Sequence, residues 1–359
     1  MKTLRLILVN LAIFLVLLVI VDPLLPSQDG FIKTDRYVRL REPKPNLDYV
    51  FQFPDGDPLR FRTDRNGFYI GENSLENAID AEIIFFGGST TECSAVPEEK
   101  RFPYLIGENL INETSNSSIK TLNAGLSGNN VMHSLVSFIA KGIPEKPKIV
   151  FLMHNVNDLA QLLKTGSYWE APKGRSVIVE EEKSSFYQRT KNYLKSTKDF
   201  FIPNTYSLVK KAVKSGSEGA DEWENYRGGK LHPFDEVLTT YKRALKSFVK
   251  VAKANDIPVV LMTQFNRFSP EDQEIRQQFQ QMFKGIEFEL FCKYYEEFNN
   301  CIRQVAIEES VEMIDLEAKV RPAKAYLTDF VHLNENGSIL VSKEISVWLI
   351  ENYPQYKLK

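Results

Sequence analysis

The chain has 359 residues, which is enough for one large domain or two smaller ones with a substantial buried core. Hydrophobic residues make up 43% of it and charged residues 26%, as in an ordinary globular protein. The net charge of −2 gives no sign of a nucleic-acid-binding protein. The three cysteines form no Cys-x-x-Cys pair and no cluster with histidine at metal-ligand spacing, so we expect neither a metal nor a cofactor.

The N-terminal segment is the clearest non-globular feature. Residues 6–21 are apolar except for Asn10, and the basic residues Lys2 and Arg5 precede them. A cleaved signal peptide and an uncleaved membrane anchor both fit, and the lack of an A-x-A-like site after the apolar run favours the anchor. We therefore predict an anchor within residues 1–26, with one membrane-spanning helix and a globular part that is periplasmic or extracellular.

Residues 27–80 are predicted to form a juxtamembrane connector and a small β element. Tyr49, Phe51 and Phe53 alternate with other residues, and the following Asp-Gly-Asp-Pro sequence is typical of a turn. The main domain is then expected to occupy residues 81–359.

From residue 81 onward the pattern becomes α/β. Helical periodicity lies between or after short apolar runs, which are typical of buried parallel strands. These runs occupy residues 83–86, 119–122, 149–153, 259–262 and 311–316. We predict a three-layer α/β/α domain with a mainly parallel sheet of about five strands. The charged and aromatic residues 164–232 predict an insertion after the third strand.

Ser89 directly follows the first of these strands. Gly87 and Gly88 precede it, which places the serine at the carboxyl end of a strand and at the start of a helical stretch. Ligands bind at that edge of open α/β sheets, and helix amides there can stabilise an oxyanion. The same pattern also fits a serine that only caps a helix after a glycine turn.

Two further strands are followed by polar or glycine-rich segments. The first contains Gly125 and Gly128, which allow close backbone approach to a ligand, although a plain turn is the more common meaning of such a pattern. The second contains Asn157, whose amide could donate a hydrogen bond. Asp158 is expected to cap the helix that follows.

Near the C-terminus, Asp329 precedes His332 by three residues. At this spacing an aspartate can orient the imidazole, while the other ring nitrogen takes a proton from a serine. A lone histidine is usually structural, but this pair occurs in a chain that already offers a serine at a sheet edge. His133 and His154 could be metal ligands, although no partner spacing supports that.

Together the four segments resemble the blocks of the SGNH hydrolases, a branch of the GDSL-like lipase/esterase superfamily, over roughly residues 81–160 and 235–352. The resemblance implies a flavodoxin-like strand order and a serine esterase activity. It implies that Ser89 is the nucleophile, that His332 is the general base and acid, and that Asp329 orients His332. It also implies an oxyanion hole formed by the Ser89 amide, the Gly128 amide and the Asn157 side chain.

Two positions depart from the family pattern. Gly88 stands where the usual Gly-Asp-Ser has aspartate, and Asn155 stands where the usual Gly-x-Asn-Asp has glycine. Asparagine tolerates a left-handed backbone better than other residues with a side chain. We therefore expect the turn at Asn155 to survive, with a polar side chain added to the rim of the cleft.

Three functions fit these residues. The first is an esterase that removes O-acyl groups, such as acetyl, from a glycan or lipid at the cell envelope. The second is an O-acetyltransferase that uses the same triad in polysaccharide modification and works with that machinery, and the third is a membrane-tethered binding domain. The complete Ser-His-Asp set favours an enzyme. Aromatic residues of the insertion could form a sugar platform or the insertion's own small core: Tyr168, Trp169, Tyr187 and Trp223.

Overall fold

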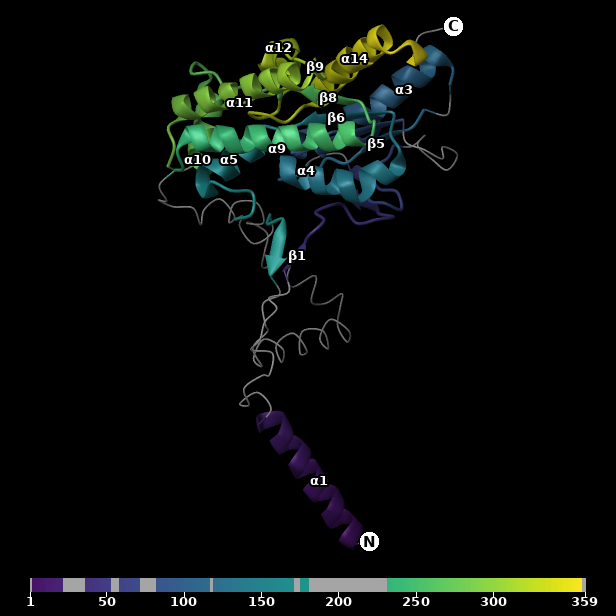
Figure 1. Cartoon of the computed structure of the whole chain (residues 1–359), viewed down its shortest axis with the longest axis vertical. Coiled ribbons are helices and arrows are strands. Elements are labelled where there is room, and N and C mark those ends of the chain that lie inside the picture. Colours follow the sequence, from purple (N-terminus) through teal and green to yellow (C-terminus); the bar gives the residue numbers. More distant parts are fainter. Residues whose placement is uncertain are drawn as a thin grey trace. The chain divides into compact units, whose positions relative to one another are not determined.

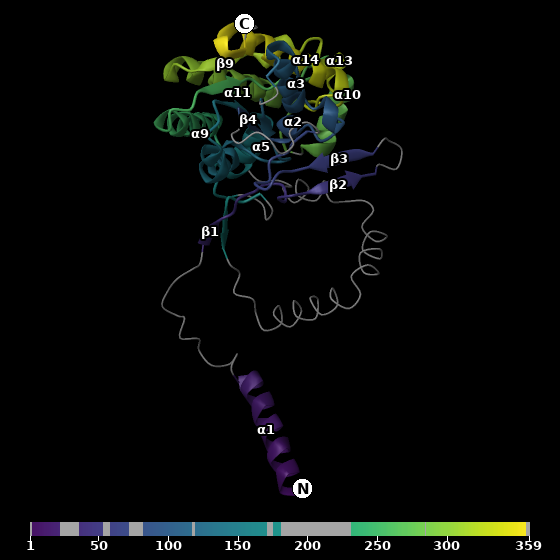
Figure 2. The same cartoon turned by 90° about the vertical axis from the view of Figure 1, so that its right-hand side faces the viewer.

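A computed structural model of the chain describes residues 2–21, 36–52, 58–71, 82–116, 119–170, 175–180, 231–283 and 285–356. The chain divides into two compact units. One consists of Met1–Val38 and Ile178–Glu218, and the other of Arg39–Val177 and Gly219–Lys359. Figures 1 and 2 show the chain from two sides.

The larger unit is built on a five-stranded parallel sheet. Its strands in chain order are β4 (Ile83–Gly87), β5 (Thr121–Asn123), β6 (Ile149–Met153), β8 (Val259–Met262) and β9 (Glu312–Ile314). In space they lie in the order β5-β4-β6-β8-β9, with every neighbouring pair parallel. The first strand therefore lies between the second and the third, which is the flavodoxin-like order. The predicted α/β fold with a five-stranded parallel sheet is confirmed.

Helices cover both faces of this sheet, as the two views show (Figures 1 and 2). One layer contains α4 (Val131–Ser137), α5 (Val156–Thr165), α9 (Phe234–Ala254) and α11 (Phe288–Glu309). The opposite layer contains α3 (Phe102–Thr114) and α14 (Glu335–Asn352). The shorter helices are α2 (Ser89–Glu92), α10 (Gln273–Met282), α12 (Leu316–Lys319) and α13 (Ala323–Tyr326).

The two layers exist because neighbouring strand residues point to opposite faces. Phe86 packs on Phe248 of α9, with ring centroids 5.6 Å apart. Phe151 meets Trp348 of α14 on the other face, with centroids 6.3 Å apart. Because apolar residues occupy both faces, β4, β6 and β8 are buried along their whole length. Their polar carboxyl ends are left as the edge at which a site can form.

The predicted small β element is a hairpin of β2 (Asp48–Phe51) and β3 (Leu59–Arg62). Phe53 and most of the connecting turn lie outside the described residues. Further along, Tyr69 exchanges two backbone hydrogen bonds with Asn123, at 2.8 and 3.1 Å. Since Asn123 belongs to the edge strand β5, these bonds satisfy part of an otherwise open sheet edge.

The smaller unit contains α1 (Lys2–Val21) and an antiparallel pair of β1 (Arg36–Val38) and β7 (Ile178–Glu180). Within the part of the chain that the structure describes, no helix is both long and apolar enough to cross a membrane. The predicted membrane-spanning helix is therefore not shown. Most of the predicted insertion, including Tyr187 and Trp223, lies outside the described residues.

Candidate active site

Ser89 lies where the central strand β4 turns into the short helix α2. Two glycines make this turn possible because the backbone there is crowded on both sides. A Cβ atom on Gly87 would lie 2.0 Å from Thr91 Oγ1, and one on Gly88 would lie 2.5 Å from Asn157 Nδ2. A larger residue at position 88 would therefore have to displace the Asn157 side-chain amide from its present place.

His332 reaches Ser89 from the loop that joins α13 and α14. Its Nε2 lies 2.7 Å from Ser89 Oγ, and its Nδ1 lies 2.7 Å from Asp329 Oδ2. The predicted contact between Ser89 and His332 is therefore present, as is the predicted contact between Asp329 and the other ring nitrogen. These residues are 243 positions apart in the chain, and the fold brings them together.

The carboxylate of Asp329 is held by its own loop. Its Oδ1 accepts hydrogen bonds from the amides of Val331 and His332, at 2.9 and 2.8 Å. Burial alone would raise the pKa of Asp329, but the hydrogen bond from the His332 ring and the two amides outweigh it and lower that pKa below its usual value. Asp329 is therefore ionised at neutral pH, and it can hold a proton on Nδ1 of His332.

Asn157 and Gly128 come to the same edge from neighbouring segments. The Asn157 side chain donates to the backbone oxygen of Asn129, at 2.8 Å, and lies against Gly88. Gly128 has a φ of +79°, a conformation that L residues with side chains seldom adopt. Asn157 thus bridges the turn that holds Ser89 and the loop that holds Gly128.

The loop around Gly128 is tied to α2 by Glu92. This carboxylate accepts hydrogen bonds from the Ser127 amide, at 2.8 Å, and from the Ser127 hydroxyl. Its other oxygen accepts from the hydroxyl of Tyr69, at 2.8 Å. Gly125 is close-packed against the same helix, because a Cβ atom there would lie 2.4 Å from the Glu92 amide nitrogen. Gly125 therefore has a structural role, in the packing of this loop on α2.

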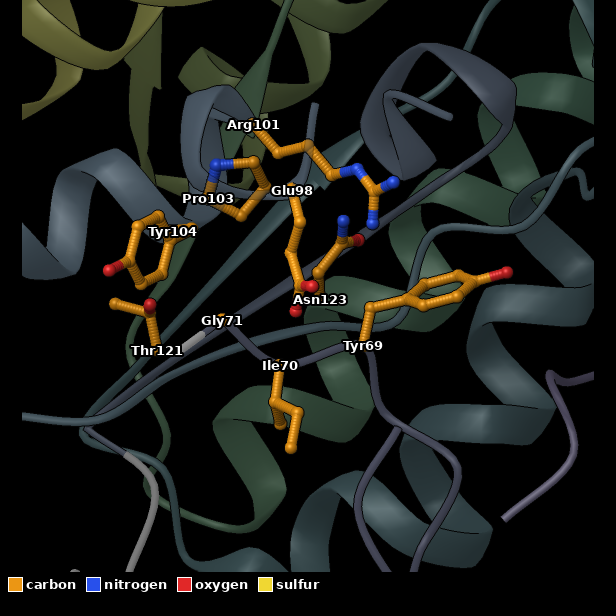
Figure 3. Close-up of a pocket in the computed structure, with 9 residues that line it drawn as sticks. All are labelled: Tyr69, Ile70, Gly71, Glu98, Arg101, Pro103, Tyr104, Thr121 and Asn123. Carbon is orange, nitrogen blue, oxygen red and sulfur yellow. The ribbon is translucent and has the colours of Figure 1, made fainter. Parts of the chain in front are cut away.

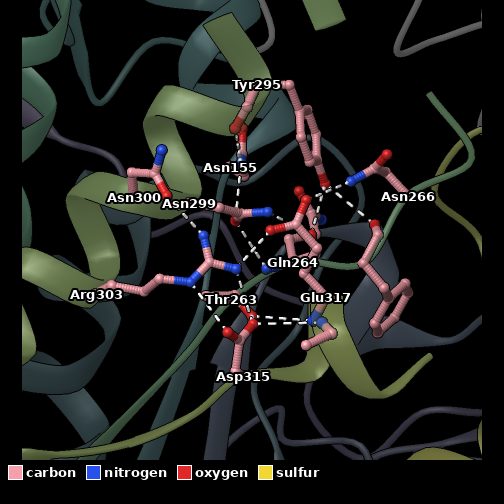
Figure 4. Close-up of polar contacts among 12 residues, drawn as sticks. Asn155, Thr263, Gln264, Asn266, Tyr295, Asn299, Asn300, Arg303, Asp315 and Glu317 are labelled. Carbon is pink, nitrogen blue, oxygen red and sulfur yellow. Dashed lines mark hydrogen bonds and ion pairs between the residues drawn. The ribbon is translucent and has the colours of Figure 1, made fainter. Parts of the chain in front are cut away.

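A buried polar network joins these segments, and no motif in the sequence predicts it. Figure 4 shows the part of it around Gln264, Asn299 and Asn155. Gln264 donates to Thr90 Oγ1, at 2.8 Å, and accepts from the Val156 amide, at 2.9 Å. The residues next to Ser89 and next to Asn157 are thus joined by one side chain. Oδ1 of Asn299, on α11, accepts a hydrogen bond from the backbone nitrogen of Gln264, at 3.0 Å. Only the position of Gln264, two residues beyond the predicted strand 259–262, could have indicated this network.

Asn155 belongs to this network, which corrects one prediction. Its side chain is 1% exposed and donates to Asn299 Oδ1, at 3.0 Å, and to the backbone oxygen of Tyr295, at 2.9 Å. Its φ is −162°, so the backbone is not left-handed. The polar side chain expected at the rim of the cleft is instead buried in the core, where it joins α5 to α11.

The helix cap predicted at Asp158 is also wrong. Asp158 is completely buried in the first turn of α5, where it accepts from the Val131 amide, at 3.0 Å, and from the Tyr168 hydroxyl, at 2.6 Å. Tyr168 is therefore a core residue rather than part of a sugar platform, whereas Trp169 is 50% exposed.

Asp158 also completes a second serine-histidine-aspartate array. His154 Nε2 lies 2.8 Å from Ser134 Oγ, and His154 Nδ1 lies 3.6 Å from Asp158 Oδ2. All three residues are at most 2% exposed, so no substrate can reach them. His133, the other histidine considered as a ligand, completes the capping box of α4 instead.

Burial of Asp158 predicts an unusual pH dependence of stability. Burial raises the pKa of this carboxyl to about 7 from 3.8, although hydrogen bonds from Tyr168 and Val131 favour the charged form. Between these values the folded chain keeps a proton that the unfolded chain loses, so the contribution of Asp158 to stability falls as pH rises from about 4 to about 7. Asp158→Asn cannot ionise and escapes this loss.

We expect the free energy of unfolding of the wild type, relative to Asp158→Asn, to fall by up to about 4 kcal/mol between pH 4 and 8. Urea unfolding at several pH values measures this difference. Asp48→Asn serves as a control, because the hydrogen bond to Arg60 lowers the pKa of the Asp48 carboxyl. Its contribution to stability therefore changes only below about pH 4, and its difference from the wild type should stay flat between pH 4 and 8. If the difference in free energy of unfolding between the wild type and Asp158→Asn does not change with pH, the raised pKa of Asp158 is contradicted.

A small pocket lies away from Ser89, between the residues after the hairpin, the start of α3 and β5 (Figure 3). Its charged residues are engaged with neighbours. Arg101 donates to the backbone oxygens of Val96, at 3.1 Å, and Arg60, at 2.9 Å, while Glu98 pairs with Arg62 at 3.0 Å. We therefore assign no binding role to this pocket.

Comparison with known proteins identifies the family. The model of the GDSL-like lipase/acylhydrolase family matches residues 85–338, which include Ser89, Asp329 and His332. The comparison with curated protein sequences returned no match.

Among solved structures, the acetyl xylan esterase AlAXEase has 15% identity, a TM-score of 0.45, and coverage of 75% of this chain and 99% of its own. Axe2, an acetylxylan esterase from Geobacillus stearothermophilus, has 15% identity, a TM-score of 0.44, and coverage of 79% and 98%. Because these identities and TM-scores are low, the assignment of the chain to a family rests on the match to the family model. The chain belongs to the GDSL-like lipase/acylhydrolase family and is a hydrolase that acts on ester bonds.

Proposed function

We propose that Ser89, His332 and Asp329 form the catalytic triad of a serine esterase that removes O-acyl groups, such as acetyl, from a glycan or lipid. The observation that carries this proposal is the unbroken chain of contacts from Ser89 Oγ through both nitrogens of His332 to Asp329, each of 2.7 Å. A neutral serine is a weak nucleophile, so it needs a base within hydrogen-bond reach. The half-buried imidazole of His332, held by its hydrogen bond to Asp329, supplies that base.

The reaction follows from this geometry. Ser89 Oγ attacks the acyl carbonyl carbon while its proton moves to Nε2 of His332. The resulting imidazolium is stabilised by ionised Asp329, and it then gives the proton to the departing alkoxide oxygen. Water next attacks the acyl group on Ser89 and loses a proton to His332. That proton returns to Ser89 Oγ as the carboxylic acid leaves, so the enzyme is restored.

The Ser89 amide, the Gly128 amide and the Asn157 side chain are proposed to stabilise the oxyanion of the tetrahedral intermediate. In the structure Nδ2 of Asn157 donates one hydrogen to the Asn129 backbone oxygen, and the second hydrogen of this NH₂ group is proposed to bind the oxyanion. Such donors act when placed about 2.7–3.1 Å from the developing charge.

Asn157→Ala is expected to lower kcat by about 10²–10³-fold, as the loss of one oxyanion donor does, with a smaller change in KM. Steady-state kinetics on an aryl acetate measure this. Asn300→Ala, which removes an asparagine amide from the surface of α11, is the matched control and should retain activity. Equal kcat values for the wild type and Asn157→Ala would remove Asn157 from the proposed oxyanion hole.

The proposed function is tested by assaying the full-length protein on short-chain aryl esters and on acetylated sugars, with and without an unacetylated sugar as acceptor. Release of free acetate at a rate that the acceptor does not change supports the esterase. Transfer of acetyl to the acceptor in preference to water would support the O-acetyltransferase. No turnover of any ester would contradict both and favour the binding domain.

Location at the cell envelope is a separate proposal, supported by the sequence alone. The apolar residues 6–21 follow Lys2 and Arg5, a pattern typical of N-terminal membrane attachment with the remaining chain outside the cytoplasm. Fractionation of the full-length protein tests this. Retention in the membrane pellet after carbonate treatment supports it, and complete release without detergent would contradict it.

A further inference from the structure

The side chain of Gln264 connects the segment that carries the nucleophile to the segment that carries a proposed oxyanion donor. Its Nε2 donates to Thr90 Oγ1, at 2.8 Å, and its Oε1 accepts from the Val156 amide, at 2.9 Å. The first of these partners directly follows Ser89, and the second directly precedes Asn157. Gln264 is only 3% exposed and Thr90 only 1%, so neither can bind a substrate. Gln264 can therefore affect the reaction only through its neighbours.

These two contacts fix the orientation of the Gln264 amide group. A backbone amide can only donate, so the oxygen of Gln264 must face Val156 and its NH₂ group must face Thr90. Val156 begins α5, and the side chain of the N-cap residue, Asn155, accepts no hydrogen bond from the first turn of this helix. Gln264 thus accepts from an amide that has no acceptor within its own helix. The contact therefore helps to place the helical turn that carries Asn157.

Gln264 is itself held by α11. The side chain of Asn299 accepts from the Gln264 backbone nitrogen, at 3.0 Å, and donates to its backbone oxygen, at 2.9 Å (Figure 4). The hydroxyl of Tyr295 also donates to that oxygen, at 3.2 Å. Asn299 and Tyr295 are at most 1% exposed, and both belong to a helix of 22 residues. A long helix of the core thus sets the position of Gln264, and Gln264 in turn contacts both reacting segments.

We infer that Gln264 is a positioning residue, which keeps the Ser89 hydroxyl and the Asn157 side chain at the separation that attack on the ester requires. This inference rests on the proposed function and deepens it. The nucleophile attacks the carbonyl carbon while the donor binds the carbonyl oxygen, so both must stay in place as charge develops. The segments α2 and α5 follow different strands, β4 and β6, and Gln264 bonds to both. A displacement of about 1 Å between such groups can lower a rate by about 100-fold.

Gln264→Met in the full-length protein tests this inference, because methionine keeps the length of the side chain and removes both hydrogen bonds. We expect kcat on an aryl acetate to fall by about 10- to 100-fold with little change in KM, since the loss concerns the transition state rather than substrate binding. Thr90→Val removes only the link to the nucleophile segment and should cause part of this loss. Thr90→Ser keeps the hydroxyl and should retain kcat. When Thr90→Val is added to Gln264→Met, kcat should fall no further, because the link is already lost.

Thr263→Val is the matched control, because it removes a buried hydroxyl from the residue next to Gln264. Thr263 Oγ1 donates to Asp315 Oδ1, at 2.8 Å, and accepts from the Glu317 amide, at 3.0 Å (Figure 4). This variant should unfold at a lower temperature and keep kcat, and all variants are assayed below the temperature at which unfolding begins. If Gln264→Met loses no more kcat than Thr263→Val, the inference is overturned while the esterase proposal stands. Losses that multiply in the double variant would also overturn it, because Gln264 and Thr90 would then act independently.

Discussion

Ser89→Ala is expected to reduce ester turnover by about 10⁴–10⁶-fold, because it removes the only atom proposed to form the acyl-enzyme. The fold should persist, since Ser89 begins α2 and alanine is a good helix former. Labelling by a fluorophosphonate probe, which forms a covalent bond with an activated serine, should be lost together with turnover. Thermal unfolding of both proteins checks that the loss is chemical.

Ser134→Ala is the matched control for this variant. Ser134 Oγ also lies within hydrogen-bond distance of a histidine nitrogen, 2.8 Å from His154 Nε2, but Ser134 is only 1% exposed. Its loss should leave probe labelling intact, although the unpaired His154 costs about 1–3 kcal/mol of stability. If Ser89→Ala still binds the probe and turns over ester, the nucleophile is another residue.

Asp329→Asn is expected to lower kcat by about 10⁴-fold, as the same change does in a serine protease triad. The reason lies in the two oxygens of Asp329. Oδ1 accepts from the Val331 and His332 amides, so the asparagine oxygen must stay there and its NH₂ group must face Nδ1 of His332. Nδ1 then becomes an acceptor and the ring proton moves to Nε2. With a proton already bound, Nε2 can no longer take the proton of Ser89.

The tautomer can be measured directly. The ¹⁵N chemical shifts of His332 should report a proton on Nδ1 in the wild type and on Nε2 in Asp329→Asn. Asp48→Asn, which removes a carboxylate paired with Arg60 on the exposed hairpin, should change neither the tautomer nor kcat. An active Asp329→Asn enzyme would show that Asp329 does not orient the imidazole.

Much of the fold follows from local patterns. The continuous apolar runs that form β4, β6 and β8 are buried on both faces, which requires helices on both sides and therefore an α/β/α arrangement. β9 is shorter than its predicted run, at Glu312–Ile314, because Asp315 instead caps α12 through the Ala318 amide. The ends of elements depend on such side-chain bonds, which apolar periodicity does not describe.

The partners of single polar residues were less predictable. Asn155 was expected at the rim of the cleft, but its buried partners lie on α11. Asp158 was expected to cap a helix, but it is buried and accepts from the Tyr168 hydroxyl. A buried polar group costs free energy unless it is hydrogen-bonded, and its partners here come from segments that the sequence does not place beside it. The array of Ser134, His154 and Asp158 was missed for the same reason.

The sequence by itself determined that Ser89, Asn157 and the Asp329–His332 pair follow strands or lie close to the C-terminal helix, because strand ends and turn residues are local features. Only the tertiary structure decided which of these residues meet. The parallel strands, in the order β5-β4-β6-β8-β9, bring their carboxyl ends to one edge of the sheet. The loop before α14 places His332 at this edge, within hydrogen-bond distance of Ser89. Contacts between distant segments depend on how the layers pack, and packing is a property of the whole fold.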